Sequence, residues 1–454
     1  MQTSEARPSV SVPWVLIATV LGSAMTFIDS TAVNVSLPVL QRDLRATTGQ
    51  TQWVIEGYAL FLSSLILLGG ALGDLYGRRL IFLIGIAIFA AASLACALAG
   101  NIEVLIVARC VQGVGGALST PGSLALISAA YSGEARGRAI GMWSGFSALT
   151  SALGPVIGGW LTQSFSWRYV FLINLPNAAI VLLILLFYVA ESRDETADRR
   201  IDVGGATLVT VGLGLLVYGL IEMNGGRFTV LDVGSVIAGI VALLLFIPFE
   251  RRTPDPMVRY NLFSSKNFTV ANVYTFFLYA ALGGSLYFVP FVLINVHHYS
   301  PTAAGGALLP FIFIMVAASR WSGGLVSRLG PRTPMLLGAI VAGLGFLAFA
   351  LPGTDGSYWT TFFPAAMILG CGAVLFVAPL TTTVMDSVAT EHSGVASGIN
   401  NAVARTAGLL GVAVLGLIVT STASYLTGFR GAMIASALLC FAAAAIAARG
   451  FAAR

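Results

Sequence analysis

Charged residues are scarce in this sequence of 454 residues. Asp, Glu, Lys and Arg together make up 9% of it, whereas they make up roughly 25% of soluble domains. This shortage excludes an ordinary soluble domain. Lysine occurs once, as Lys266, which follows two serines and precedes Asn267. The chain therefore lacks the Gly-Lys-Ser/Thr segment of a P-loop, which argues against ATP coupling within it.

Histidine and cysteine are also rare, with three and four residues respectively. The cysteines all lie in apolar segments, and neither residue type has the spacing of a metal site. The sequence also contains no nucleophilic triad or dinucleotide-binding loop in a suitable setting. We therefore expect no metal, no other cofactor and no enzymatic activity.

Apolar residues, in contrast, dominate the chain at 57%. Apolar runs recur along its whole length, and about 20 helical residues cross a hydrocarbon core of roughly 30 Å. The first run continues to Leu40, past any cleavage site, which argues against a secretory signal. We predict an all-α integral membrane protein with about 14 transmembrane helices, near residues 13–38, 52–72, 79–99, 102–125, 137–162, 168–190, 204–222, 231–249, 268–294, 303–325, 334–351, 360–384, 394–420 and 430–448.

The basic residues indicate the orientation of these helices. An even number of spans places both termini on one side, and most of the 24 Lys and Arg residues fall on that side. Because cytoplasmic loops carry an excess of Lys and Arg, we predict a multi-pass protein of the cell membrane with both termini in the cytoplasm. The net charge of +5 is then explained by the basic residues of the cytoplasmic loops. The expected partner of the chain is the lipid bilayer, and no nucleic acid is expected.

An internal repeat divides the chain. GALGDLYGRRLIFLIG (70–85) and GGLVSRLGPRTPMLLG (323–338) align without gaps and share glycine, leucine and arginine positions. Their offset of 253 residues also relates the first span to the span that starts near residue 268. Two parallel halves are the layout of transporters that alternate around a site near the membrane midplane. We predict an N-terminal six-helix half, linkers with a two-helix insertion, and a C-terminal six-helix half, at 1–190, 191–266 and 267–454.

Several motifs follow one another in a consistent order. GALGDLYGRR is close to the loop G-x-L-A-D-R-x-G-R-K/R, with Leu75 in place of the usual basic residue, and it contains Gly70, Asp74, Gly77, Arg78 and Arg79. IDSTAVNVSLP, RCVQGVGG, GPVIGG, WRYVFLINLP and YSPTAAGGALLP lie at matching places in other spans and loops. In order and placement these motifs resemble the major facilitator superfamily, and within it the drug:proton antiporters with fourteen spans.

The resemblance implies a fold of two six-helix halves with two inserted helices. It also implies a proton-coupled antiporter that exports amphipathic drugs or antibiotics from the bacterial inner membrane and functions as a monomer. The sequence departs from the family pattern at three places. Ser327 stands where the second loop would repeat Asp74, Thr150 replaces a glycine of the fifth span, and Glu56 stands where a neutral residue is expected.

Three ionisable residues lie at a similar depth in the outer half of the predicted spans, namely Asp29, Glu56 and Arg109. Such residues are rare within membranes and usually face a cavity or a partner. Burial favours the protonated form of a carboxyl group, and a nearby guanidinium favours the ionised form. We predict a proton-coupling cluster in which Arg109 approaches Asp29 in only one conformation. A static Asp29–Arg109 pair that holds the helices together is the alternative.

The predicted substrate cavity draws on both halves. Gln112 lies on a polar-to-small face of the fourth span, and Asn401 and Arg405 lie on a similar stripe of the second half. Arg405 either lines the cavity or only pairs with carbonyl groups. The two carboxylates of the outer half favour cationic substrates. Five aromatic residues either stack against a flat substrate or serve packing, and we assign the first three to the cavity: Phe27, Trp53, Tyr58, Tyr274 and Phe277.

Small residues of the fifth span let helix backbones approach closely, and by family analogy this helix belongs to the interface that seals during antiport. The residues are Gly154, Pro155, Gly158 and Gly159.

The loop after the second span predicts a conformational latch. The carboxylate of Asp74 would meet a helix N-terminus or an arginine such as Arg138, and Gly70 and Gly77 would permit a tight turn. A solvated loop charge is the alternative. We interpret residues 190–202 as a solvated linker.

Together these features predict a proton-coupled secondary active transporter that exchanges protons for a small-molecule substrate. Its expected substrates are amphipathic, cationic drugs or antibiotics, exported by alternating access. The alternatives are an exporter dedicated to one metabolite, an importer on the same fold and, less favoured, a polytopic membrane enzyme.

Overall fold

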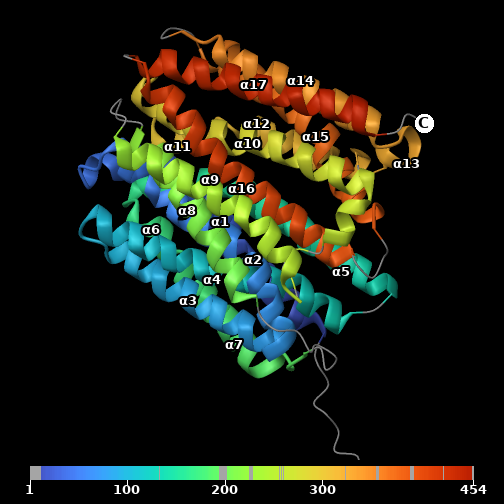
Figure 1. The fold of residues 1–454 in the computed structure, drawn as a ribbon. Coiled ribbons are helices and arrows are strands. Elements are labelled where there is room, and N and C mark those ends of the chain that lie inside the picture. Colours follow the sequence, from blue (N-terminus) through green and yellow to red (C-terminus); the bar gives the residue numbers. More distant parts are fainter. Residues whose placement is uncertain are drawn as a thin grey trace, which may run out of the picture.

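The computed structural model is a bundle of long helices that run side by side (Figure 1). It describes residues 12–451 except 132, 194–201, 224–228, 255, 257, 259, 323, 354–356, 389–392 and 423. Within these residues no strand occurs, and 14 helical segments are long and apolar enough to cross a membrane. The predicted all-α membrane fold with about 14 spans is confirmed.

Among the first six spans, the second and the fourth begin at a residue whose side chain caps the helix. Thr47 and Gln50 form a capping box at the second span, and Asn101 accepts a hydrogen bond from the Val104 amide at the fourth. The sixth span is divided only at Ile173, whose backbone angles (φ −59°, ψ −24°) remain helical. The helices are α1 (Val12–Asp43), α2 (Thr48–Tyr76), α3 (Arg78–Leu98), α4 (Ile102–Ala130), α5 (Gly133–Ser164), α6 (Arg168–Leu172) and α7 (Asn174–Tyr188).

The next two spans are α8 (Val203–Glu222) and α9 (Val230–Arg252). Asp202 caps α8, and Thr229 and Asp232 form a capping box at α9. The remaining elements are η2 (Tyr260–Ser264), α10 (Lys266–Asn295), α11 (Pro301–Gly306), α12 (Leu309–Ser322), α13 (Leu325–Leu329), α14 (Arg332–Ala350), η3 (Tyr358–Thr360), α15 (Phe362–Asp386), α16 (Ser393–Thr420) and α17 (Tyr425–Gly450).

The predicted tenth span, 303–325, is interrupted in the structure. α11 ends at Gly306, and α12 begins at Leu309. Pro310 has no N–H group to donate to the carbonyl one turn earlier. The helical hydrogen-bond ladder therefore stops at this point and starts again in α12.

The helices alternate in direction between two ends of the bundle. One end, the terminal face, carries Val12, Arg78 and Gly450, and the other end, the distal face, carries Asp43 and Thr48. Because the number of spans is even, both ends of the described chain lie on the terminal face.

The sequence repeat corresponds to a repeated turn. Gly77, between α2 and α3, has φ of +119°, and Gly330, between α13 and α14, has φ of +69°. These glycines occupy the same position in the two copies, 253 residues apart, and they are the glycines with positive φ in the described part of the chain. A side chain is disfavoured at positive φ. The repeat thus preserves a backbone turn.

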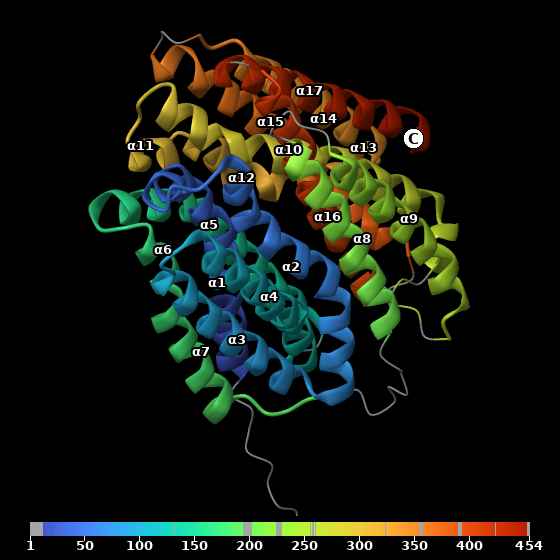
Figure 2. The same cartoon turned by 60° about the vertical axis from the view of Figure 1, so that its left-hand side comes forward.

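The helices form two groups, α1 to α7 and α10 to α17, which meet along two seams. In Figure 2 the first group (blue to green) lies below the second (yellow to red), and α8 and α9 lie at the side. α5 packs against α11 along one seam, and α2 packs against α16 along the other. α8 contacts both α2 and α16. α8 therefore covers the second seam.

Candidate functional site

Asp29 and Arg109 form an ion pair within the first group of helices. Arg109 Nη1 lies 2.5 Å from Asp29 Oδ2, and both side chains are 0% exposed. Asp29 comes from α1 and Arg109 from α4, so the pair joins two helices. The structure brings together two of the three members of the predicted proton-coupling cluster.

Other groups hold the Arg109 guanidinium in place. Its Nε donates to the Val54 carbonyl at 2.9 Å, and its Nη1 also donates to the side-chain oxygen of Gln112 at 2.6 Å. The central guanidinium carbon, Cζ, lies 4.2 Å from the centre of the Tyr58 ring and 5.7 Å from the centre of the Phe171 ring. Cation–π contacts of this kind are stronger when desolvated. Arg109 therefore keeps several contacts that do not depend on Asp29.

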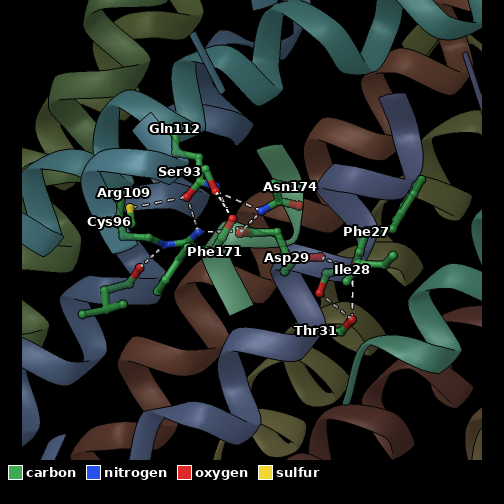
Figure 3. Close-up of polar contacts among 12 residues, drawn as sticks. Phe27, Ile28, Asp29, Thr31, Ser93, Cys96, Arg109, Gln112, Phe171 and Asn174 are labelled. Carbon is green, nitrogen blue, oxygen red and sulfur yellow. Dashed lines mark hydrogen bonds and ion pairs between the residues drawn. The ribbon is translucent and has the colours of Figure 1, made fainter. Parts of the chain in front are cut away.

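Two amide side chains complete the surroundings of Asp29 (Figure 3). Asp29 Oδ1 accepts hydrogen bonds from Gln112 Nε2 at 3.0 Å and from Asn174 Nδ2 at 3.2 Å. Ser93 Oγ accepts from both amides and donates to the Phe171 carbonyl. The network thus connects α1, α3, α4 and the sixth span. Hydrogen bonds in which one partner is ionised are shorter and stronger than those between neutral groups.

Sequence reasoning missed Asn174 and Ser93. Asn174 lies in WRYVFLINLP, which was noted only for its resemblance to the family. An uncharged polar residue in an apolar span carries little signal, because it also occurs where it bonds to the backbone of its own helix.

Glu56 is separate from the ion pair. It is 0% exposed, and neither of its carboxylate oxygens has a hydrogen-bond partner in the part of the chain that the structure describes. Tyr287 of α10 lies within electrostatic range of it. The predicted cluster of three residues is therefore a pair plus an isolated buried carboxyl group beside the second group of helices.

Several residues predicted to line the substrate cavity have other contacts. Gln112 is fully buried and belongs to the Asp29 network, so the prediction that it lines a cavity is wrong for this conformation. Trp53 packs against an apolar cluster of residues from α2, α8 and α16. The side-chain amide of Asn401 is exposed and donates to the carbonyl one turn earlier in its own helix.

The other three candidates differ in burial. Tyr58 is buried, whereas Phe27 and Arg405 are half-buried. Arg405 lies within electrostatic range of Tyr58 and of Tyr279 on α10. Of the predicted cavity residues, Tyr58 and Arg405 are thus the two that the structure places near each other across the seam of α2 and α16.

A cavity of about 260 Å³ lies farther along the same seam, closer to the terminal face. Its lining includes Ser64 and Leu67 of α2, Ala402 of α16, Val209 of α8 and Phe246 of α9. Sequence reasoning gave the insertion no role. In the structure, α8 and α9 both form part of the wall of this cavity.

The predicted latch has a different arrangement. Asp74 Oδ1 lies 2.9 Å from Arg78 Nη2, one turn later in the chain. The N-terminus of α3 is instead occupied by Glu191, whose carboxylate accepts hydrogen bonds from the amides of Arg79 and Leu80 at 3.0 Å each. Of the two predicted partners of Asp74, a helix N-terminus and an arginine such as Arg138, the structure thus shows an arginine, but it is Arg78. Glu191, which was assigned to a solvated linker, caps α3.

The two glycines of this loop also differ from the prediction. Gly70 lies inside α2, where an added Cβ would be 3.6 Å from Pro121 of α4, and it does not form a turn. Gly77 forms the turn, and an added Cβ there would lie 2.6 Å from the carboxyl carbon of Glu191. Gly77 thus provides both the backbone conformation and the space for the Glu191 cap. Arg79 donates from Nη2 to the Leu186 carbonyl.

The glycines of α5 pack against the neighbouring helices. An added Cβ would lie 1.8 Å from Thr31 Oγ1 at Gly154 and 2.5 Å from the Ala32 carbonyl oxygen at Gly158. Gly159 approaches α11 in the same way, since an added Cβ there would lie 2.3 Å from the Pro301 carbonyl oxygen. Pro155 lies against Gly305 of α11. This segment therefore contacts α1 on one side and the second group of helices on the other.

Comparison with known proteins identifies the family. The family model described as Major Facilitator Superfamily matches residues 19–412 of the chain. The chain belongs to this superfamily. Major facilitator proteins are transporters and not enzymes, so the protein is a multi-pass membrane transporter.

Several curated relatives are named as resistance proteins. Multidrug resistance protein Stp of Mycobacterium tuberculosis is 37% identical over 408 residues, which cover 89% of this chain and 75% of that protein. The tetracenomycin C resistance and export protein of Streptomyces glaucescens is 33% identical over 411 residues, with 90% and 76% covered. The methylenomycin A resistance protein of Bacillus subtilis is 33% identical over 432 residues, with 94% and 91% covered.

Solved structures of two transporters share the fold. A D-xylose–proton symporter matches with a TM-score of 0.70 at 13% identity, over 97% of this chain and 98% of that chain. A peptide transporter in complex with sulfate matches with a TM-score of 0.69 at 16% identity, over 96% and 95%. At such low identity the likeness concerns the fold alone.

Proposed function

We propose that this protein is a proton-coupled antiporter that exports amphipathic drugs or antibiotics by alternating access. The observation that carries the proposal is the Asp29–Arg109 ion pair, which is fully buried between α1 and α4. A buried carboxylate beside an arginine is a group whose ionisation depends on the approach of that arginine. Intramembrane pairs of this kind often form proton relays in transporters.

The network suggests how a proton would act. Protonation of Asp29 removes the negative charge from the pair, but Arg109 stays attached to the Val54 carbonyl, to Gln112 and to the Tyr58 ring. The loss of attraction is then felt mainly between α1 and α4. A proton that crosses the membrane potential supplies roughly 2.3 kcal/mol per 100 mV, and a ~100-fold substrate gradient needs about 2.7 kcal/mol. One proton is therefore close to sufficient for a modest gradient.

Glu56 is a second proton carrier in this proposal. Its carboxyl group is buried without a hydrogen-bond partner among the described residues, and an isolated ionised carboxylate is very unfavourable in such a place. Glu56 would therefore hold a proton in this conformation and release it when the seam between the two groups of helices opens.

The relatives support the direction of transport and the kind of substrate. Their names describe resistance and, in one case, export. Export requires that the protein has a defined orientation in the membrane. The excess of basic residues supports an orientation in which the terminal face lies on the cytoplasmic side of a bacterial inner membrane. We expect a single chain to be functional.

An exporter dedicated to one compound is the second candidate, because several relatives are named for resistance to a single antibiotic. A panel of unrelated compounds distinguishes the two. Uptake of many of them into inverted vesicles indicates a multidrug exporter, whereas uptake of one indicates a dedicated exporter.

Substitution of Asp29 tests the proton coupling. The purified chain is placed in proteoliposomes with a pH gradient, and internal pH and substrate are followed together. We expect Asp29→Asn to fold and to bind substrate but to lose uphill transport. Asp43→Asn is the matched control, because Asp43 lies at the distal end of the same helix and bonds Trp167 and Arg168 outside the network. Uphill transport by Asp29→Asn at the wild-type rate would show that the pair is static.

A further inference from the structure

Arg405 carries a charge that no described residue neutralises. It lies on α16, which packs against α2 of the other group of helices, and it is half-buried. The structure shows no hydrogen bond or ion pair between its guanidinium and any described residue. An arginine at membrane depth is costly and normally faces a cavity or an acceptor. Arg405 is therefore a donor group that lacks an acceptor.

The hydroxyl group of Tyr58 lacks a partner as well. Tyr58 is 3% exposed, and its hydroxyl has no hydrogen-bond partner among the described residues. The hydroxyl lies against α4, where an added Cβ at Gly116 would be 3.4 Å from it. Buried hydroxyl groups nearly always have a partner, so each exception requires an explanation. The same part of the molecule holds a second unpaired donor, because Leu60 of α2 and Leu409 of α16 belong to one apolar cluster, and Tyr58 and Arg405 lie within about one helical turn of these residues.

The charges at this depth do not favour a cationic ligand. The sequence-based hypothesis of cationic substrates rested on Asp29 and Glu56, but Arg109 neutralises Asp29, and Glu56 is 0% exposed. Among the ionisable residues Asp29, Glu56, Arg109 and Arg405, Arg405 is the one whose side chain is partly accessible. A ligand between α2 and α16 thus meets a positive charge, and the buried hydroxyl donor of Tyr58 lies beside this seam.

We propose that Arg405 and the Tyr58 hydroxyl form a subsite that binds a carboxylate, phenolate or carbonyl group of the substrate. Both groups then gain the acceptor that the chain does not provide. Hydrogen bonds from a guanidinium to an anionic oxygen are among the strongest in proteins. The proposal rests on the proposed transport function, because the ligand is taken to be the transported substrate. It identifies that substrate as an amphipathic compound with an acceptor or anionic group.

The position of Tyr58 also links this subsite to the ion pair. Its ring covers the Arg109 guanidinium at 4.2 Å, while its hydroxyl belongs to the subsite. A substrate bound to the hydroxyl therefore contacts the residue that packs on Arg109. This arrangement places substrate and proton sites on two sides of one side chain.

Two dyes of similar shape and opposite charge test the proposal. Fluorescein and rhodamine 123 share a flat xanthene ring system, but fluorescein is anionic and rhodamine 123 cationic. Their binding to the purified full chain is measured by fluorescence anisotropy. We expect saturable binding of fluorescein, a Kd at least ~10-fold higher in Arg405→Gln and about 5-fold higher in Tyr58→Phe, and a smaller increase in Arg405→Lys. The binding of rhodamine 123 should not weaken in these variants.

Matched controls are Tyr218→Phe and Arg328→Gln, which alter exposed residues of α8 and α13 and should leave the Kd of fluorescein unchanged. Absence of saturable fluorescein binding by the wild type, or an unchanged Kd in Arg405→Gln, would overturn the subsite. Proton-coupled transport of rhodamine 123 without fluorescein binding would refute the subsite alone. Fluorescein binding without any proton-coupled transport would refute the transport proposal alone.

Discussion

At the scale of residues, Asp29 accepts hydrogen bonds from three side chains. The strength of these bonds depends to different degrees on the charge of Asp29. Arg109 contributes a charged donor, and Gln112 and Asn174 contribute neutral amides. The amides retain their bonds to Ser93 whatever the charge of Asp29. Removal of one amide therefore leaves the ion pair in place and exposes the contribution of the neutral part of the network.

Asn174→Leu should destabilise the protein through this network. The substitution leaves Asp29 Oδ1 with one donor fewer and deprives Ser93 of a partner. Loss of an ordinary hydrogen bond costs about 0.5–1.5 kcal/mol, and loss of a bond to a charged group costs about 1.5–3 kcal/mol. The melting temperature of the purified protein, measured in the same detergent as the wild type, should fall. Asn401→Leu is the matched control, because that exposed amide bonds only within its own helix. Equal losses in the two variants would contradict the role of Asn174.

The charged members of this site could be predicted, and the neutral ones could not. A charge inside an apolar run is visible at once, because its cost in hydrocarbon requires an explanation. Asn174 costs less and therefore stands out less. Glu56 was also visible, but its separation from Arg109 depends on the rotation of α2 about its axis, which composition does not determine. Tyr58 was selected as an aromatic residue, whereas its unpaired hydroxyl emerged only from the packing.

At the scale of elements, the start of α3 depends on a residue more than 100 positions later in the chain. Glu191 follows α7, yet it accepts hydrogen bonds from Arg79 and Leu80. The Arg78 amide donates to the Ser192 carbonyl at 2.8 Å in addition. The segment after α7 therefore fastens the loop between α2 and α3, so a movement of one is transmitted to the other.

Glu191→Ala should loosen the start of α3. Loss of a side-chain cap costs about 0.5–2 kcal/mol, which corresponds to local exchange that is roughly 2- to 30-fold faster. Hydrogen exchange of the peptide that contains Arg79 and Leu80 measures this change. Asp74→Asn removes only the partly exposed pair with Arg78, and pairs of this type contribute less than ~1 kcal/mol. Faster exchange in Asp74→Asn than in Glu191→Ala would show that Asp74 is the more important residue.

Hydropathy predicted the membrane-spanning helices, but it predicted their ends and interruptions less well. The lengths of the apolar runs predicted the spans because the bilayer sets a minimum length. The break before α12 was missed although Pro310 was visible, since proline inside membrane helices is often accommodated without a break. The partner of the α3 N-terminus was missed because Glu191 comes from another part of the chain.

At the scale of the whole molecule, the two groups of helices are locked together at the distal face by backbone contact. Gly159 of α5 meets Pro301, and Gly305 of α11 meets Pro155. The side chain of Gln163 lies 3.4 Å from the Thr302 amide, from which it accepts a hydrogen bond. Where two backbones touch, there is no space between them for a side chain. We therefore expect this seam to have two states, one closed as in the structure and one with the two segments separated.

Gly305→Val should therefore shift the protein toward a conformation with a separated distal seam. An added Cβ at Gly305 would lie 2.1 Å from the Pro155 carbonyl oxygen, and backbone atoms cannot yield as a flexible side chain does. A change that disfavours one of two conformations raises the population of the other. Spin labels at Phe165 and His298, both exposed near the distal face, should report longer distances, and transport should slow because the seam no longer closes.

The neighbouring glycine provides a stringent control for this prediction. Gly306 lies in the same short helix, but an added Cβ there would meet no atom within 4 Å. Gly306→Val thus adds the same side chain and the same change in helix propensity without the clash. If both variants show the same spin-label distances, the effect arises from the helix and not from the seam. If only Gly305→Val shows longer distances, close backbone contact is what holds the distal face shut.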